Sequence, residues 1–169
     1  MELYTPCYAA FYRYCRGITG NSDDAWDLAG ETILVVFENL NNLRKKDSFK
    51  AYLFGVARRL RLSHNRRRKF KADYIEGEAD LIISSDPLPD FHPDIELLYE
   101  YLNHLPLKQK EAFLLFEFSG FSIKEIQKLQ GGTASGVKTR LKRAREQLQL
   151  WLDDENDYLK DEIGKEGSK

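Results

Sequence analysis

The sequence predicts an all-α protein made of two small helical domains. Apolar residues recur at helical spacing in several segments, whereas strand signals are weak throughout. Between Asp73 and Pro93 this periodicity is lost, and a glycine and three prolines stand among acidic residues, which is typical of a linker. We expect domains at residues 1–71 and 94–152, an acidic flexible linker at 72–93 and an acidic tail at 153–169.

Composition limits the classes of protein that fit. The apolar fraction of 42% is too high for a disordered chain, and the charged fraction of 31% is too high for a membrane protein. The longest apolar runs, at 33–37 and 113–116, are far shorter than the ~20 residues that cross a bilayer. The N-terminus has no signal-peptide pattern. We therefore expect a cytoplasmic protein that does not insert into membranes.

Cysteine and histidine residues give no sign of a metal site or an active site. Cys7 and Cys15 are eight residues apart, about two helical turns, and are expected to face a core. No CxxC motif or cluster of cysteine and histidine is present, so we expect neither a metal nor a cofactor. His64, His92 and His104 have no matching nucleophile or ligand spacing, and we do not expect an enzyme.

The net charge of −1 hides a strong segregation of charge along the chain. Residues 40–71 hold twelve Lys or Arg against one acidic residue, and residues 72–100 hold nine acidic residues and no Lys or Arg. Residues 124–149 hold seven basic residues against two acidic ones. Because a merely solvated surface mixes its signs, two basic blocks divided by an acidic one predict two binding sites for a polyanion.

Three helices are expected in the N-terminal domain. The first covers residues 8–18, and the second is capped by Ser22 or Asp23. One stripe of the second helix is expected to be buried, formed by Ala25, Leu28, Ala29, Thr32, Ile33, Val36, Phe37 and Leu40. A third helix is expected from a cap at Ser48 to about Phe70, with most of its arginines facing outward.

The C-terminal domain contains a pattern typical of a helix-turn-helix. Residues 122–125 read Ser-Ile-Lys-Glu, a capping box that begins a short helix, which Gly131 and Gly132 end. Thr133 then caps a second helix. Its outward side chains can contact phosphates and base edges; they are Ser135, Lys138, Thr139, Lys142, Arg143 and Arg145. The pattern predicts a DNA-reading helix-turn-helix, and the alternative is an ordinary helical hairpin with a solvated basic face.

Aromatic side chains are interleaved with the cations of the first basic block. They are Phe49, Tyr52, Phe54 and Phe70. Flat rings beside cations that follow a nucleic-acid backbone are what binding of single-stranded DNA requires. Some rings must also pack the domain. A core position is at least as well supported for Phe54, and Tyr52 is the better candidate for a DNA contact.

These segments together resemble the extracytoplasmic-function sigma factors, compact promoter-recognition subunits of bacterial RNA polymerase. The order of the matching strings and their spacing around the acidic linker carry the resemblance, because each string alone is short. The strings are Asp-Ala-Trp-Asp-Leu at 24–28, Glu-Thr at 31–32, Ala-Tyr-Leu-Phe-Gly-Val-Ala-Arg at 51–58, Arg-Arg-Arg at 66–68, Leu-Pro at 105–106, Gln-Lys-Glu at 109–111, Glu-Ile at 125–126, Val-Lys-Thr-Arg-Leu at 137–141 and Arg-Ala-Arg at 143–145.

The resemblance implies a role for each domain. The first would be a sigma region 2-like bundle that binds core RNA polymerase through Asp24, Asp27, Leu28 and Glu31. Its loop at 41–47 would receive a base flipped out of the minus-ten element. The opened strand would be bound by Arg44, Lys45, Lys46, Phe49, Tyr52, Arg58, Arg59, Arg61, Arg66 and Arg67.

The second domain would be a sigma region 4-like helix-turn-helix in the major groove of the minus-thirty-five element. The residues implied for this contact are Thr133, Ser135, Lys138, Thr139, Arg140, Lys142 and Arg143. The resemblance also implies an anti-sigma protein as a partner, beside core polymerase and promoter DNA in its duplex and melted forms.

Two other functions remain open from the sequence. A free-standing transcription regulator would use the same helix-turn-helix without binding polymerase, but this leaves the N-terminal domain without a purpose. A sigma-like decoy would capture an inhibitory anti-sigma protein, but it has no need of two basic blocks. The leading hypothesis is an alternative sigma factor that directs promoter-specific transcription initiation.

Overall fold

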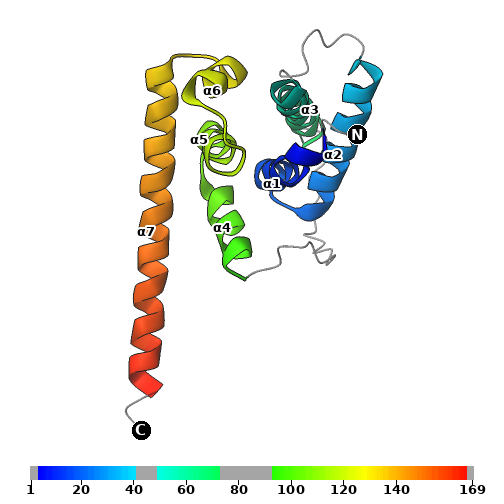
Figure 1. Ribbon diagram of the computed structural model, residues 1–169. Coiled ribbons are helices and arrows are strands. Elements are labelled where there is room, and N and C mark those ends of the chain that lie inside the picture. The colour runs from blue at the N-terminus through cyan, green and yellow to red at the C-terminus, as the bar shows by residue number, and fades with distance from the viewer. Residues whose placement is uncertain (1–3, 41–48, 73–92, 167–169) are drawn as a thin grey trace.

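The computed structural model describes residues 4–40, 49–72 and 93–166, and every regular element in these ranges is a helix (Figure 1). The all-α prediction is confirmed. The predicted linker lies outside the described residues apart from its two ends. The main helices are α1 Tyr8–Thr19, α2 Ser22–Glu38, α3 Phe49–Ala72, α4 Pro93–His104, α5 Leu107–Phe113, α6 Ile123–Gln130 and α7 Ala134–Glu166. No helix in the described ranges is long and apolar enough to cross a bilayer.

The turn between α1 and α2 is set by a glycine and an asparagine. Gly20 has a left-handed backbone with a φ of 95° and ends α1. The Asn21 side chain then accepts a hydrogen bond from the backbone N–H of Asp24 at 2.8 Å and caps α2. The predicted cap, Ser22 or Asp23, is therefore wrong. Asn21 has the extended backbone that a capping residue needs, and α2 has already begun at Ser22.

Helix α2 buries most of its predicted apolar stripe but not all of it. Leu28 is 1% exposed, and the other buried members are Ala25, Ala29, Thr32 and Val36. Phe37 is 46% exposed, so its predicted core position is wrong. It follows Leu28 by nine residues, about two and a half helical turns, and therefore points to the opposite side of the helix.

The helix-turn-helix is present in α6 and α7. The backbone N–H of Ser122 donates to Glu125 Oε2 at 2.8 Å, and Ser122 Oγ accepts from the Glu125 backbone N–H at 3.3 Å, which completes the capping box. Gly131 and Gly132 make the turn with backbone φ values of 76° and 89°, which residues other than glycine rarely adopt. Thr133 Oγ1 accepts from a backbone N–H in the first turn of α7 at 3.0 Å and caps that helix.

Helix α7 runs past residue 152, where the predicted C-terminal domain ends. Its first part is buried through Val137, Leu141, Ala144 and Leu148, and it packs against α5, α6 and α4. It then continues to Glu166, so the predicted acidic tail is helical as far as the structure describes it. No proline interrupts residues 134–166. In Figure 1 this helix extends well beyond the rest of the molecule.

The two domains pack against each other and share one core. Helix α1 contacts α4, α5 and the π-helical turn Leu114–Phe118 (η4), and α3 contacts α6. The fully buried ring of Phe54 lies 5.0 Å, centre to centre, from the ring of Phe121 in the C-terminal domain. Gly17 allows close approach, because a Cβ added there would lie 2.5 Å from two methyl carbons of Leu114. The sequence does not predict this interface.

Phe54 is expected to stabilise both domains at once. Its ring contacts the rings of Phe11, Tyr14 and Phe121, with centres 5.0 to 5.4 Å apart. Phe54→Leu should lower the free energy of unfolding by about 1–3 kcal/mol in a single denaturant-induced transition. The control is Phe37→Leu, which should change it by less than about 0.5 kcal/mol because that residue is 46% exposed and lies outside the buried core. Two separate transitions would contradict a shared core.

The capping box of α6 gives a pH-dependent prediction. Ser122→Ala should lower the free energy of unfolding by about 1 kcal/mol at neutral pH, because it removes the side-chain cap. Hydrogen bonds from Ser122 hold the pKa of Glu125 below its ordinary value of 4.5. A carboxyl whose pKa is lower in the folded state stabilises the fold above its unfolded pKa, and this stabilisation is lost as the pH falls through its folded pKa.

Denaturant unfolding at neutral pH and at about pH 3 measures this effect. The cost of Ser122→Ala should be smaller at the acidic pH. Ser135→Ala, in the exposed first turn of α7, is the control and should matter little at either pH. An equal cost of Ser122→Ala at both pH values would show that Glu125 takes no part in the cap.

Candidate nucleic-acid interface

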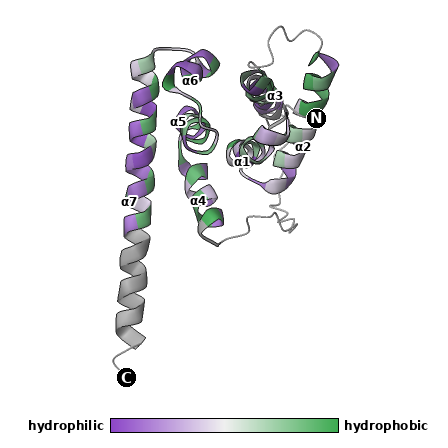
Figure 2. Cartoon of the chain, in the orientation of Figure 1, coloured by the Kyte–Doolittle hydropathy of each residue, from purple (hydrophilic) through white to green (hydrophobic). Residues whose placement is uncertain are grey.

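The outward face of α7 brings together most of the residues that the sequence assigned to duplex DNA. Thr133 at the cap is exposed, and so are Ser135, Lys138, Thr139, Lys142 and Arg143. Their spacing of three and four residues places them on one side of the helix, opposite the buried apolar residues. The first half of α7 is accordingly largely hydrophilic in Figure 2. This is a basic helix face, preceded by a tight turn, with the shape that enters a major groove.

Arg140 is the exception on this helix. It is half-buried, and its Nη1 donates to Gln130 Oε1 at 2.7 Å. The amide nitrogen of Gln130 in turn donates to Glu111 Oε2 at 2.7 Å and to the backbone carbonyl of Lys108 at 3.1 Å. Arg140 is therefore turned toward the inside of the C-terminal domain, and it connects α7 to α5 through the last residue of α6.

The predicted single-strand residues on α3 lie in three environments, which are the exposed surface, the core and the interface between the domains. Arg59, Arg66 and Arg67 are exposed, and Tyr52 is half-buried. Phe49 is 6% exposed and belongs to the core, so its ring offers no open face to a base in this arrangement. The predicted residues Arg44, Lys45 and Lys46 lie outside the described residues.

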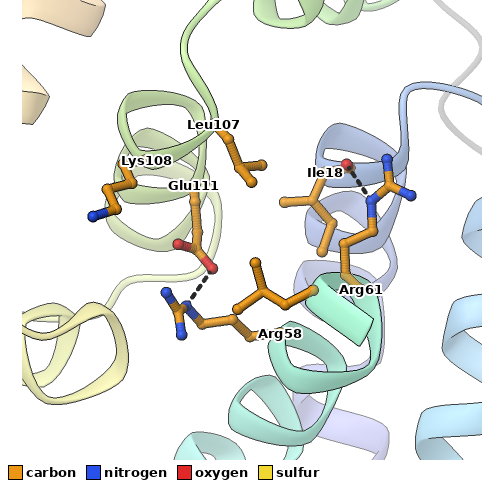
Figure 3. Close-up of a pocket in the computed structure, with 7 residues that line it drawn as sticks. Ile18, Arg58, Arg61, Leu107, Lys108 and Glu111 are labelled. Atoms are coloured by element: carbon orange, nitrogen blue, oxygen red, sulfur yellow. Dashed lines mark hydrogen bonds and ion pairs between the residues drawn. The ribbon is translucent and has the colours of Figure 1, made fainter. Parts of the chain in front are cut away.

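Arg58 and Arg61 lie at the interface between the domains. Arg58 Nε is 2.8 Å from Glu111 Oε1, an ion pair from α3 to α5 (Figure 3). Arg61 donates from Nε to the carbonyl of Ile18 at 3.0 Å and from Nη2 to the carbonyl of Thr19 at 3.4 Å, and so closes the C-terminal end of α1. Both arginines line a small pocket, together with Ile18, Leu62, Leu107, Lys108 and Glu111.

Glu111 is the centre of the polar contacts at this interface. Its side chain is 7% exposed, and besides Arg58 and Gln130 it accepts a hydrogen bond from the Tyr14 hydroxyl at 3.2 Å. Burial raises the pKa of Tyr14 well above its ordinary value, and the nearby Glu111 carboxylate adds a smaller effect in the same direction. Burial also lowers the pKa of the neighbouring Lys110 to about 8, with a smaller effect of Arg61. The environment is therefore poor in water, and charges in it need partners.

Two further cations of the N-terminal domain reach the C-terminal domain. Lys50 on α3 donates from Nζ to the backbone carbonyl of Ser119, and it lies 4.6 Å from the centre of the Phe121 ring. Arg16 on α1 pairs with Glu96 at 3.0 Å and lies over the ring of Tyr99. Cations of the first domain thus bind carboxylates, a carbonyl and rings of the second.

The outward face of α2 mixes acidic and apolar side chains. Of the residues predicted to bind polymerase, Asp27 is exposed, Asp24 is half-buried at the cap, and the Glu31 carboxylate lies 3.0 Å from His64 Nε2. Leu28 is in the core and does not contribute to this face.

Three exposed apolar residues on α2 were missed by the sequence analysis. Trp26 is 46% exposed, Leu34 66% and Phe37 46%. The spacings of eight and three residues, each close to a whole number of helical turns, are the signal that could have found them. The C-terminal half of α2 is accordingly hydrophobic in Figure 2. An exposed apolar stripe among acids is typical of a surface that binds another protein.

Metal-binding side chains do not gather in the part of the chain that the structure describes. No three His, Cys, Asp or Glu residues lie close enough there to hold an ion. Cys7 and Cys15 are both buried thiols, and burial raises the pKa of both.

Comparison with known families matches both domains. The Sigma-70 region 2 family matches residues 3–71, and the Sigma-70 region 4 family matches residues 95–148. The second match contains α6 and the basic part of α7, and the first contains α1, α2 and nearly all of α3.

Similar proteins cover most of the chain. The ECF RNA polymerase sigma factor EcfG of Rhodopseudomonas palustris is 31% identical, over 88% of this chain and 83% of that protein. The RNA polymerase sigma factor SigV of Bacillus subtilis is 27% identical, over 86% of both.

Solved structures match the arrangement of both domains. The sigma factor RpoE from Bartonella quintana, in complex with the anti-sigma factor NepR, has a TM-score of 0.79 at 25% identity, and the match covers 89% of this chain and 94% of that one. CnrH, in complex with the cytosolic domain of CnrY, shares the fold with a TM-score of 0.65. This chain belongs to the extracytoplasmic-function sigma factors of bacterial RNA polymerase.

Proposed function

We propose that this chain directs core RNA polymerase to promoters and that its two domains divide the work. The helix-turn-helix carries this proposal, because its exposed basic face on α7 offers four cations or hydroxyls per two turns to a DNA groove while the opposite face is fixed to α5. The C-terminal domain would read the minus-thirty-five element. Its contacts would come from Thr133, Ser135, Lys138, Thr139, Lys142 and Arg143, with Arg140 anchoring the helix and reaching a phosphate after release from Gln130.

The outward face of α2 is proposed to bind polymerase. Asp27 and Glu31 would supply charge, and Leu34 with Phe37 would supply the apolar area that a stable contact between proteins requires. Leu28 would act from the core, because it keeps α2 in place rather than touching the partner. A free-standing regulator has no use for this face, and this observation disfavours that alternative.

Helix α3 is proposed to bind the opened strand of the minus-ten element. Tyr52 offers a half-buried ring for a flipped or stacked base, and Arg59, Arg66 and Arg67 are exposed to its phosphates. Arg58 and Arg61 would join them only after leaving their present partners. A decoy for an anti-sigma protein has no need of these cations.

The proposed partners follow from the family. Two of the similar solved structures are complexes with anti-sigma or cytosolic partner domains, and we propose that an anti-sigma protein also binds this chain. The chain would act in the cytoplasm, where bacterial polymerase works, and would catalyse no reaction of its own.

Run-off transcription with core polymerase tests the function. The wild-type chain should yield promoter-specific transcripts from genomic fragments, and core polymerase alone should not. Leu34→Lys should abolish them and should lower affinity for core polymerase at least about tenfold, because it places a charge in a desolvated contact. Leu150→Lys is the matched control: Leu150 on α7 is 63% exposed against 66% for Leu34, and its substitution should leave transcription intact. Absence of any transcript with the wild-type chain would reject the function.

Salt dependence of duplex binding tests the role of α7. Lys138→Ala and Arg143→Ala should each weaken binding of a promoter duplex and reduce the slope of log affinity against log salt by about 1, since one phosphate contact fewer releases fewer counterions. Gln147→Ala, an exposed and uncharged position one turn beyond Arg143, should leave the slope unchanged. Fluorescence anisotropy at several salt concentrations gives both quantities. Equal slopes for all proteins would remove these cations from the interface.

A further inference from the structure

We infer that Arg145 is a positioning residue for DNA reading by α7, because its ion pair with Glu117 fixes the rotation of this helix about its own axis. The inference rests on the proposed reading of the minus-thirty-five element by α7. It is carried by two contacts between one guanidinium and the π-helical turn η4, and by the place of Arg145 at the edge of the buried side of α7.

Two neighbouring residues of η4 hold the Arg145 guanidinium. Its Nε and Nη2 both donate to Glu117 Oε1, at 3.0 and 2.6 Å. Its central carbon lies over the ring of Phe116, 5.4 Å from the ring centre. A planar guanidinium that is bound through both its edge and its face has little freedom to rotate. The sequence predicts a DNA-facing side chain for Arg145, whereas the structure gives it a protein partner in one defined geometry.

The π-helical turn gives this contact a fixed base. The backbone N–H and the hydroxyl of Ser119 both donate to the carbonyl of Leu114, each at 3.1 Å. Leu114 and Leu115 are buried, so the turn is anchored in the core. Turns of this kind are rare in proteins and frequently occur at functional sites. The turn presents Phe116 and Glu117 to α7 from a backbone that cannot easily shift.

Arg140 and Arg145 lie at opposite edges of the buried side of α7. Arg140 directly precedes the buried Leu141, and Arg145 follows it by four residues, so the two arginines point about 140° apart with the buried residues between them. Arg140 is bound to Gln130 on one side, and Arg145 is bound to Glu117 on the other. A single tether would let α7 roll on its apolar contacts, and two tethers on opposite edges prevent this.

Rotation of α7 matters more for reading bases than for holding phosphates. Lys138 lies seven residues before Arg145, about two helical turns, and therefore on the same side of the helix. A roll of α7 would move its tip sideways in a groove. Hydrogen bonds to base edges require defined directions, whereas a cation attracts phosphates from many orientations. Loss of the Glu117 tether should therefore reduce discrimination between DNA sequences much more than it reduces affinity for DNA in general.

The experiment compares the full-length wild-type chain with Arg145→Ala, Arg145→Lys and Glu117→Ala. The wild type first selects its sequence from a duplex library with about ten random base pairs, one turn of DNA. Fluorescence anisotropy at several salt concentrations then gives the affinity of each protein for the selected duplex and for a scrambled one.

All three variants should lower the ratio of the two affinities at least about fivefold, the lower end of what one misread base pair costs. Arg145→Lys belongs with them because it keeps the charge but loses the planar fork that binds Glu117. The slope of log affinity against log salt should stay at the wild-type value, since no phosphate contact is removed. The double variant of Arg145→Ala and Glu117→Ala should discriminate no worse than either single variant, because the two residues act as a unit.

Glu146→Ala is the matched control. The Glu146 carboxylate lies 3.6 Å from Lys142 Nζ in a pair within α7, which ties the helix to no other element. Its substitution removes the same charge as Glu117→Ala, so both should raise affinity for any duplex to a similar extent, and only Glu117→Ala should lower the ratio. Melting temperatures should agree within about 2 °C, because exposed ion pairs add little to stability.

The outcomes separate this inference from the function on which it rests. If the wild type discriminates and all three variants discriminate equally well, the positioning role is overturned while the role of α7 stands. A slope that falls by about 1 in Arg145→Ala, with wild-type behaviour of Arg145→Lys, would make Arg145 a phosphate contact instead. A wild-type chain that selects no sequence would reject the reading of DNA by α7, and the inference with it.

Discussion

The arrangement of the two domains depends on one buried carboxylate, that of Glu111, which contacts side chains from both domains. Removing an ionised carboxyl from water is costly unless it is paired and hydrogen-bonded. Glu111 meets this requirement with Tyr14 from α1, Arg58 from α3 and Gln130 from α6. The positions of these three helices relative to α5 are therefore coupled, since a shift of any one of them leaves a charge or a donor without its partner. Apolar packing of Phe54 on Phe121 supplies the cohesion, and the polar contacts fix the register.

Helices α2 and α7 use the same geometry for different partners. Each buries one side against its own domain and presents the other to solvent. On α2 the outward side carries Leu34 and Phe37 beside acids, which suits a protein surface, whereas on α7 it carries lysines, an arginine and hydroxyls, which suits a DNA groove. The division of labour thus follows from which residue types stand at the exposed positions of each helix.

Local patterns could be predicted from the sequence, and long-range contacts could not. The capping box at Ser122 and the glycine turn depend on residues within four positions of each other. Both can therefore be predicted from short stretches of sequence. The predicted core position of Phe37 is wrong because apolar character alone does not report that this residue is rotated by half a helical turn from Leu28. The sequence predicts only a DNA contact for Arg58 because its partner, Glu111, is 53 residues away, and no periodicity reports a contact at that separation.

Packing of the two domains explains how a folded protein can hold a cluster of cations that suit DNA before DNA is present. Arginines clustered on α3 repel one another, and Glu111 and the Ser119 carbonyl offset part of that repulsion. Phosphate contacts weaken steeply with salt because they release counterions, whereas a buried ion pair is screened much less. Rising ionic strength therefore favours the protein's own carboxylate over a phosphate as the partner of Arg58. The balance between the two partners depends on how much water reaches the interface. The buried side chains of Phe54, Phe121 and Leu114 exclude water from it.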